Sequence, residues 1–182
     1  MKGVPSENII LGNGSDEVLD LLFRTFCEPM QDEVIITPPT YGMYKVLAEV
    51  NQVQLKEVAL TEDFQLKFDE VLDAISEKTK LIFLCSPNNP SGNLMSNQAI
   101  KKILKHFKGL VILDEAYIDF ATQSSFVSEL NHYPNLVILQ TFSKAFAHAG
   151  IRLGMAFAQK EVIQLMHKIK PPYNINQLTQ EK

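Results

Sequence analysis

The segment LVILQTFSKAFAHAGIR, residues 136–152, joins a short apolar run to a cluster of hydroxyl, amine and guanidinium groups. The run Leu136–Leu139 is apolar at every position, which is typical of a strand buried on both faces. Lys144 follows this strand directly after Ser143, and Arg152 ends the segment. An amine beside such groups suits covalent attachment to a carbonyl compound whose phosphate is bound nearby. The ordinary alternative is a solvated loop lysine, so the rest of the chain must decide between the two.

Two more apolar runs end at polar side chains. Asn89 follows the run Leu81–Cys85, and Asp114 follows the run Leu110–Leu113. The carboxyl ends of parallel strands meet at one edge of a sheet, where α/β proteins bind their ligands. We therefore expect an amide, a carboxylate and the Lys144 amine to form one site. Asn89 and Asp114 each have a local alternative. Asn89 could belong to a plain turn, and Asp114 could be an exposed acid at a strand end.

Strands and helices alternate along the chain, and several of the strands are apolar throughout. This alternation predicts an α/β fold, a three-layer α/β/α arrangement around a mostly parallel sheet, in one domain that spans residues 1–182. We expect helices over 16–26, 41–50, 68–75, 96–107 and 160–169, and strands from Ile9 and over 34–37, 53–60, 81–85, 110–113, 136–139 and 155–158. The sequence finishes on the polar residues 180–182, and no clear closing element is expected there.

The composition predicts a substantial core and excludes several classes of partner. The 182 residues are 46% hydrophobic, and the formal net charge at pH 7 is −4. The lysines between Lys101 and Lys108 alternate with apolar residues, which is typical of the solvated face of a helix rather than of a nucleic-acid site. Cys27 and Cys85 have no partner at metal or redox spacing, and no apolar run has membrane-spanning length. We expect a cytoplasmic protein without a metal, membrane or nucleic-acid partner.

Two further segments have chemical potential. In GNGSD, residues 12–16, glycines precede Ser15 and Asp16 at a helix start, which leaves backbone N–H groups free to bind an anion. The alternative is an ordinary capped helix after a turn. Tyr41 follows Pro38 and Pro39 closely, and its ring could pack on a flat ligand or lie half-buried in the core. Both segments gain a functional meaning only together with the three strand-end residues.

Five segments occur in an order and spacing that resemble the large domain of fold-type I pyridoxal-phosphate aminotransferases. They are GNGSDE (12–17), PPTYGMY (38–44), SPNNPSG (86–92), DEAYIDF (114–120) and TFSKAFAHAGIR (141–152). The resemblance covers about residues 9–172, nearly the whole chain, with Ser91 in place of the more usual threonine. The forms PPTYGMY and DEAYIDF resemble the histidinol-phosphate branch more than the aspartate or aromatic aminotransferases.

The resemblance implies pyridoxal 5′-phosphate as the cofactor and a role for each matching residue. Lys144 would bind the cofactor covalently and move a proton at the substrate Cα, and Asp114 would pair with the ring nitrogen. Asn89 and Tyr117 would hydrogen-bond the phenolic oxygen of the ring, and Tyr41 would stack on its face. The implied catalytic residues are thus Lys144, Asp114 and Tyr117. The phosphate would be bound by Ser15, Asp16, Thr141, Ser143 and Arg152.

The implied reaction exchanges an amino group between L-histidinol phosphate and 2-oxoglutarate and belongs to histidine biosynthesis. The resemblance also implies a homodimer, and the small-molecule partners would be an amino donor and a 2-oxo acid. Two alternatives stay open: a threonine-phosphate decarboxylase, which shares the fold and the cofactor residues, and a non-catalytic aminotransferase-like ligand-binding domain. Members of the family are considerably longer and carry an N-terminal arm and a C-terminal small domain. We therefore expect a cofactor platform with weak or no turnover by itself.

Overall fold

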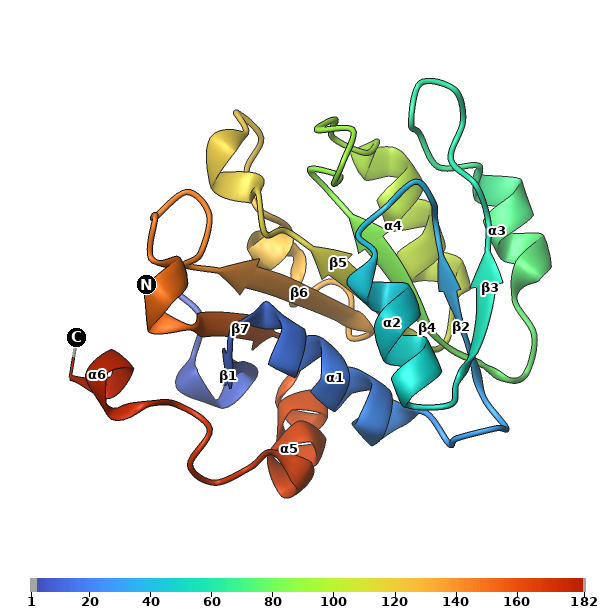
Figure 1. Cartoon of the computed structure of the whole chain (residues 1–182). Coiled ribbons are helices and arrows are strands. Elements are labelled where there is room, and N and C mark those ends of the chain that lie inside the picture. Colours follow the sequence, from blue (N-terminus) through green and yellow to red (C-terminus); the bar gives the residue numbers. More distant parts are fainter. Residues whose placement is uncertain (1–2, 182) are drawn as a thin grey trace.

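A seven-stranded sheet forms the middle layer of the computed structural model, which describes residues 3–181 (Figure 1). The strand order is β1-β7-β6-β5-β4-β2-β3. The strands are β1 (Ile9–Asn13), β2 (Glu33–Ile36), β3 (Gln54–Glu57), β4 (Thr79–Cys85), β5 (Leu110–Asp114), β6 (Leu136–Thr141) and β7 (Leu153–Phe157). β7 is antiparallel to both of its neighbours, and the pairs from β6 to β3 are all parallel. The expected mostly parallel sheet is confirmed.

The reversed direction of β7 follows from the short connection that precedes it. A parallel connection needs a crossover of about a dozen residues or more, usually a helix. Residues 142–152 contain only a 3₁₀ turn, Ala149–Ile151, so the chain turns back beside β6. This connection leaves Lys144 and Arg152 at the carboxyl edge of the sheet, where β4 and β5 also end.

The five longer helices cover both faces of the sheet, as Figure 1 shows. Side chains of α1 (Ser15–Phe26), α2 (Met43–Val50) and α5 (Lys160–Ile169) belong to one buried cluster, and those of α3 (Phe68–Ala74) and α4 (Asn97–His106) to the other. Strand residues alternate between the clusters because successive side chains of a strand point to opposite faces. The expected three-layer α/β/α arrangement is confirmed.

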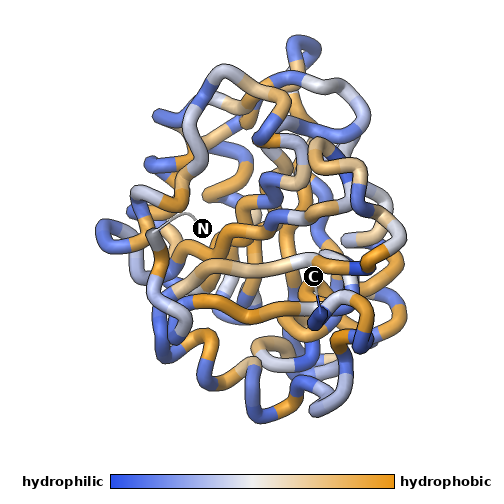
Figure 2. The backbone as a smooth tube through the Cα atoms, turned by 90° about the vertical axis from the view of Figure 1, so that its left-hand side faces the viewer, coloured by the Kyte–Doolittle hydropathy of each residue, from blue (hydrophilic) through white to orange (hydrophobic). Residues whose placement is uncertain are grey.

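Apolar residues concentrate in the strands, whereas the connecting loops are largely polar (Figure 2). Every residue of β6 is buried, and so is every residue of β4 except Lys80. Burying a side chain the size of leucine or phenylalanine contributes about 1.5–3 kcal/mol, so these central strands dominate the stability of the sheet. No helix in residues 3–181 is long and apolar enough to cross a membrane.

Several predicted boundaries differ from the observed ones. α2 begins at Met43 rather than at residue 41, because the chain is still in the turn that follows Pro38 and Pro39. β3 covers only Gln54–Glu57 of the predicted strand 53–60, since it is an edge strand whose one partner, β2, is four residues long. A short helix, α6 (Gln177–Gln180), closes the chain where no closing element was expected, and Lys182 lies outside the described residues.

Candidate active site

The carboxyl ends of β4, β5 and β6 and the N-terminus of α1 surround a cavity on the α1–α2 side of the sheet. The residues that line it include Ser15, Tyr41, Asn89, Asp114, Tyr117 and Lys144, which are six of the ten predicted cofactor-binding residues. Cys85 and Ala116 complete the lining. The strand ends thus bring together the amide, the carboxylate and the amine that the sequence predicted to meet.

Asp114 is the last residue of β5 and is only 4% exposed. Its Oδ2 accepts a hydrogen bond from the Tyr44 hydroxyl at 2.7 Å, and its Oδ1 accepts one from the Ala116 N–H at 3.0 Å. Burial raises the pKa of this carboxyl, because the two hydrogen bonds offset only part of the cost of desolvation. Within residues 3–181 no lysine or arginine forms an ion pair with Asp114. The carboxylate therefore suits a cationic N–H donor from the cavity.

The two adjacent asparagines of SPNNPSG have different environments. Asn88 is buried, and its Nδ2 donates to the Pro39 carbonyl at 2.9 Å and to the Ser91 hydroxyl at 2.6 Å. These bonds tie the loop after β4 to the loop after β2, so Asn88 has a structural role. Asn89 is half-buried and lines the cavity. The plain-turn alternative explains Asn88, and Asn89 is the amide available to a ligand.

Lys144 lies at the exposed rim of the cavity, on the connection between β6 and β7. Its Nζ lies over the ring of Tyr117, 5.4 Å from the ring centroid. Tyr117 is half-buried and follows β5 by three residues. The amine therefore lies over the aromatic ring of Tyr117, both residues line the cavity, and the lysine is exposed to solvent.

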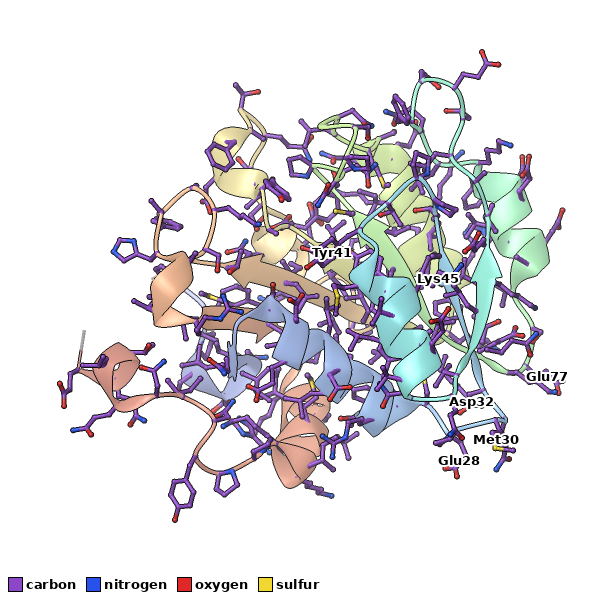
Figure 3. The ribbon with its side chains drawn as sticks, in the orientation of Figure 1. Glu28, Met30, Asp32, Tyr41, Lys45 and Glu77 are labelled. Atoms are coloured by element: carbon purple, nitrogen blue, oxygen red, sulfur yellow. The ribbon has the colours of Figure 1, made fainter. Side chains whose placement is uncertain are left out.

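Tyr41 lies just before α2, and Figure 3 places it near the centre of the molecule, away from Glu28, Met30 and Asp32 before β2. Its hydroxyl donates to the Asp16 carboxylate at 3.1 Å. Burial and the nearby negative charge of Asp16 raise the pKa of Tyr41, so the phenol stays protonated. The ring is half-buried and lines the cavity, as packing on a flat ligand would require.

The N-terminus of α1 lies at one end of the cavity, where the anion was expected. The helix begins after Gly14, whose φ is 86°, and no side chain of the described residues caps its first turn. A Cβ at Gly14 would lie 2.4 Å from Nη2 of Arg152, and one at Gly154 would lie 2.2 Å from the backbone N of Ser15. Both glycines therefore let β7 and the Arg152 guanidinium approach the helix start, where the dipole favours an anion.

Three predicted phosphate-binding residues have other partners in this structure. The Thr141 hydroxyl donates to the Leu153 carbonyl at 3.3 Å and accepts from the Ser143 N–H at 3.1 Å. These bonds shape the turn that leaves β6. The Asp16 carboxylate accepts from Tyr41, so a contribution of Asp16 to anion binding would come from its backbone N–H. Ser143 is half-buried beside this turn.

Tyr44 and Cys85 belong to the site and were not predicted from the sequence. Tyr44 is fully buried in α2, where its ring stacks on Phe83 at 5.1 Å and its hydroxyl reaches Asp114. The available signal was the spacing of Tyr41 and Tyr44 in PPTYGMY, because residues three apart lie on the same side of a helical turn. Cys85 ends β4, and burial raises the pKa of its thiol to about 12.

The groups around the cavity fit pyridoxal phosphate, although the cavity is small. The buried carboxylate of Asp114, which has no cation among residues 3–181, matches a protonated ring nitrogen. The Lys144 amine matches an aldehyde, and the uncapped start of α1 beside Arg152 matches a phosphate. The cavity volume is about 30 Å³, so a ring can enter only if exposed side chains such as Lys144 move. A hollow of about 680 Å³ lies elsewhere, between Leu104 and Asn135, and none of the predicted residues lines it. Residues 3–181 contain no group of acidic, histidine or cysteine side chains suited to a metal ion.

Proteins of known name share both the sequence and the fold. The chain is 59% identical over 174 residues to the histidinol-phosphate aminotransferase of Flavobacterium johnsoniae, a match that covers 96% of this chain and 50% of the relative. It is 58% identical to the enzyme of that name from Bacteroides fragilis strain YCH46, over 100% of this chain and 53% of the relative. The chain thus spans about half the length of the curated relatives it matches.

The solved structures give the same picture. The crystal structure of the histidinol-phosphate aminotransferase from Clostridium acetobutylicum superposes with a TM-score of 0.86 at 30% identity, and the match covers 95% of this chain and 52% of that one. The family model described as aminotransferase class I and II matches residues 2–181. The chain therefore belongs to the class I and II aminotransferase family.

Proposed function

We propose that this chain is the cofactor-binding part of a pyridoxal-phosphate-dependent aminotransferase that exchanges an amino group between L-histidinol phosphate and 2-oxoglutarate. The observation that carries the proposal is the convergence of Asn89, Asp114 and Lys144 on one cavity beside the α1 N-terminus. The identity of 56–59% to proteins named histidinol-phosphate aminotransferase supports this substrate. The enzyme acts in histidine biosynthesis, and its partners are a small-molecule amino donor and a 2-oxo acid.

Pyridoxal phosphate, when bound, supplies an aldehyde that exchanges with an amine and a ring that accepts electrons from the substrate Cα. Lys144 would hold the cofactor covalently, and its free amine would move the proton at the substrate Cα. The exposed rim position of Lys144 gives it the freedom that both tasks need. Asp114 accepts a hydrogen bond from the protonated ring nitrogen, and its burial makes that interaction strong.

The remaining residues orient the cofactor. Asn89 and Tyr117 hydrogen-bond the phenolic oxygen, and Tyr41 packs its ring on the face of the cofactor. The phosphate binds at the α1 N-terminus through Ser15, Asp16, Thr141, Ser143 and Arg152, with backbone N–H groups and the guanidinium as the main donors. We further propose that the whole protein is a cytoplasmic homodimer.

Attachment at Lys144 is the test of the cofactor proposal. The chain is incubated with pyridoxal 5′-phosphate, reduced with borohydride and digested, and the pyridoxyl group is located by peptide mass. We expect the label on Lys144 and its loss in Lys144→Ala, whereas Lys160→Ala, which removes another exposed lysine, keeps it. A label on Lys160 or Lys168 in the unchanged chain would contradict the assignment.

The substrate is tested in a protein that contains this chain together with the segments present in its longer relatives. L-Histidinol phosphate and 2-oxoglutarate should yield glutamate. Release of carbon dioxide from L-threonine phosphate without glutamate formation would favour the decarboxylase alternative. Cofactor attachment without either reaction would favour a ligand-binding domain.

A further inference from the structure

The Tyr44 side chain is held on all sides and directed at one acceptor. It is fully buried, its ring stacks on Phe83 at 5.1 Å, and Phe83 stacks in turn on Phe23 at 5.1 Å. The edge of the Tyr41 ring packs against it at 5.6 Å. Because these aromatic neighbours fix the ring, the hydroxyl has little freedom apart from its 2.7 Å hydrogen bond to Oδ2 of Asp114.

We propose that Tyr44 is a positioning residue, which fixes the orientation of the Asp114 carboxylate so that its remaining lone pairs face the cavity. A carboxylate has about four lone-pair sites. The Tyr44 hydroxyl uses one on Oδ2, and the Ala116 N–H uses one on Oδ1. With both oxygens held, the carboxylate cannot rotate when a ligand binds. The inference rests on the proposed function, because it concerns how Asp114 meets a ring nitrogen.

The same hydrogen bond favours the charged form of Asp114, because it lowers a pKa that burial raises. Burial and the negative charge of Asp16 raise the pKa of Asp114, whereas the Tyr44 hydroxyl, the Ala116 N–H and the Lys144 amine lower it. A protonated Asp114 would be a hydrogen-bond donor and could not pair with a protonated ring nitrogen. The other titratable groups near this carboxyl are Cys85 and Tyr41, whose burial keeps both protonated.

Tyr41 and Tyr44 lie three residues apart, but their hydroxyls bind different carboxylates. The Tyr41 hydroxyl donates to Asp16, and the Tyr44 hydroxyl donates to Asp114. Tyr41 is half-buried and lines the cavity, whereas Tyr44 is fully buried and is not one of the lining residues, although its ring packs against Tyr41. Tyr44 therefore acts on the ligand through Asp114.

The first test needs no cofactor. The carboxyl carbon of Asp114 is followed by ¹³C NMR as the pH changes, and Asp114→Asn identifies the signal. We expect Tyr44→Phe to raise the midpoint by about one pH unit, because a hydrogen bond to a charged group is lost. Tyr173→Phe, which removes a hydroxyl that is fully accessible at 94% exposure, should leave the midpoint unchanged. An unchanged midpoint in folded Tyr44→Phe would overturn the proposal.

A second measurement uses the unchanged chain and so does not depend on whether Tyr44→Phe folds. The ¹³Cζ signal of Tyr44 should shift at the same pH as the Asp114 carboxyl, since the two groups share one hydrogen bond. A Tyr44 signal that stays constant through the titration of Asp114 would also overturn the proposal.

The third test separates this inference from the proposed function. Two probes are compared, pyridoxal 5′-phosphate and its analogue with carbon in place of the ring nitrogen. Tyr44→Phe should weaken binding of the first about tenfold and leave the second nearly unchanged, because one charge-assisted contact depends on Asp114. Equal affinity of the unchanged chain and of Tyr44→Phe for pyridoxal phosphate would overturn the role of Tyr44. Failure of both probes to reach Lys144 in the unchanged chain would instead overturn the proposed function.

Discussion

Two buried carboxylates lie at opposite ends of the sheet and have opposite surroundings. Glu33 begins β2 and is 3% exposed, and Asp114 ends β5 and is 4% exposed. Oε1 of Glu33 lies 2.8 Å from the Lys56 ammonium and accepts hydrogen bonds from the hydroxyls of Ser76 and Thr79, both at 2.6 Å. Asp114 has hydrogen-bond donors but no ion pair among the described residues.

The difference appears in the direction of each pKa shift. Burial alone would raise the pKa of Glu33, but Lys56 and the two hydroxyls outweigh it and lower the pKa. Burial outweighs the hydrogen bonds to Asp114, so the pKa of that carboxyl is raised. Removing one partner of a buried ion pair is strongly destabilising, whereas a buried acid without a cation is a candidate for binding a ligand. The carboxylate at the amino ends of the strands, Glu33, has its cation within the chain. The carboxylate at their carboxyl ends, Asp114, has hydrogen-bond donors but no cation among the described residues.

The largest expected effect comes from removing the satisfied carboxylate. Glu33→Ala should lower the free energy of unfolding by about 3 kcal/mol, because Lys56 and the hydroxyls of Ser76 and buried Thr79 lose their acceptor. This is the lower end of the usual range for a buried pair, since the Lys56 side chain is 32% exposed. The loss is measured by urea denaturation at pH 7.

Glu57→Ala is the control for the Glu33 experiment. Glu57 is 3.9 Å from Lys45, and both side chains are about half exposed, so its loss should be much smaller. Because the pKa of Glu33 is lowered in the folded state, its contribution is present above the unfolded value of 4.5 and is lost as the pH falls through the folded value. Equal effects of the two substitutions would mean that the interactions of Glu33 add no more stability than an exposed ion pair.

Asp114→Asn should raise the free energy of unfolding, by less than Glu33→Ala lowers it. In the chain without cofactor the amide keeps the shape of the carboxylate and removes an unpaired buried charge, so we expect a gain of about 1–2 kcal/mol at pH 7. The raised pKa of Asp114 means that its stabilising, protonated form is fully present below the unfolded value of 3.8 and is lost as the pH rises. The gain should therefore disappear below about pH 4 in denaturation curves. A destabilised Asp114→Asn chain at pH 7 would contradict an uncompensated charge.

Much of the carboxyl end could be predicted from the sequence, because it follows from local signals. The apolar runs of β4, β5 and β6 identify central strands, and parallel strands bring the residues that follow them to one edge. Asn89, Asp114 and Lys144 could be placed together on that basis alone. The helix α5, predicted over 160–169, begins and ends as expected because its apolar spacing is regular.

What the sequence did not predict depends on contacts between distant segments. Tyr44 looks like one apolar position of a helix, and only the packing of α2 on the sheet brings its hydroxyl to Asp114, 70 residues away. Glu33 lies beside a short apolar run, and its partner Lys56 comes from the next strand. The reversal of β7 could have been inferred from the helix-free connection 142–152, which is too short for the usual crossover.

The smallest expected effect concerns Ser76, one of the three residues that donate to the Glu33 carboxylate. Ser76→Ala removes one of three donors to Oε1 and should lower the free energy of unfolding by about 0.5–1 kcal/mol, because Lys56 and Thr79 still satisfy the oxygen. In a double-mutant cycle with Glu33→Ala, the Ser76 effect should become smaller, since the hydroxyl has already lost its acceptor. Fully additive effects, measured by urea denaturation of the four variants, would mean that Ser76 stabilises the chain through its bond to the Lys78 N–H rather than through Glu33.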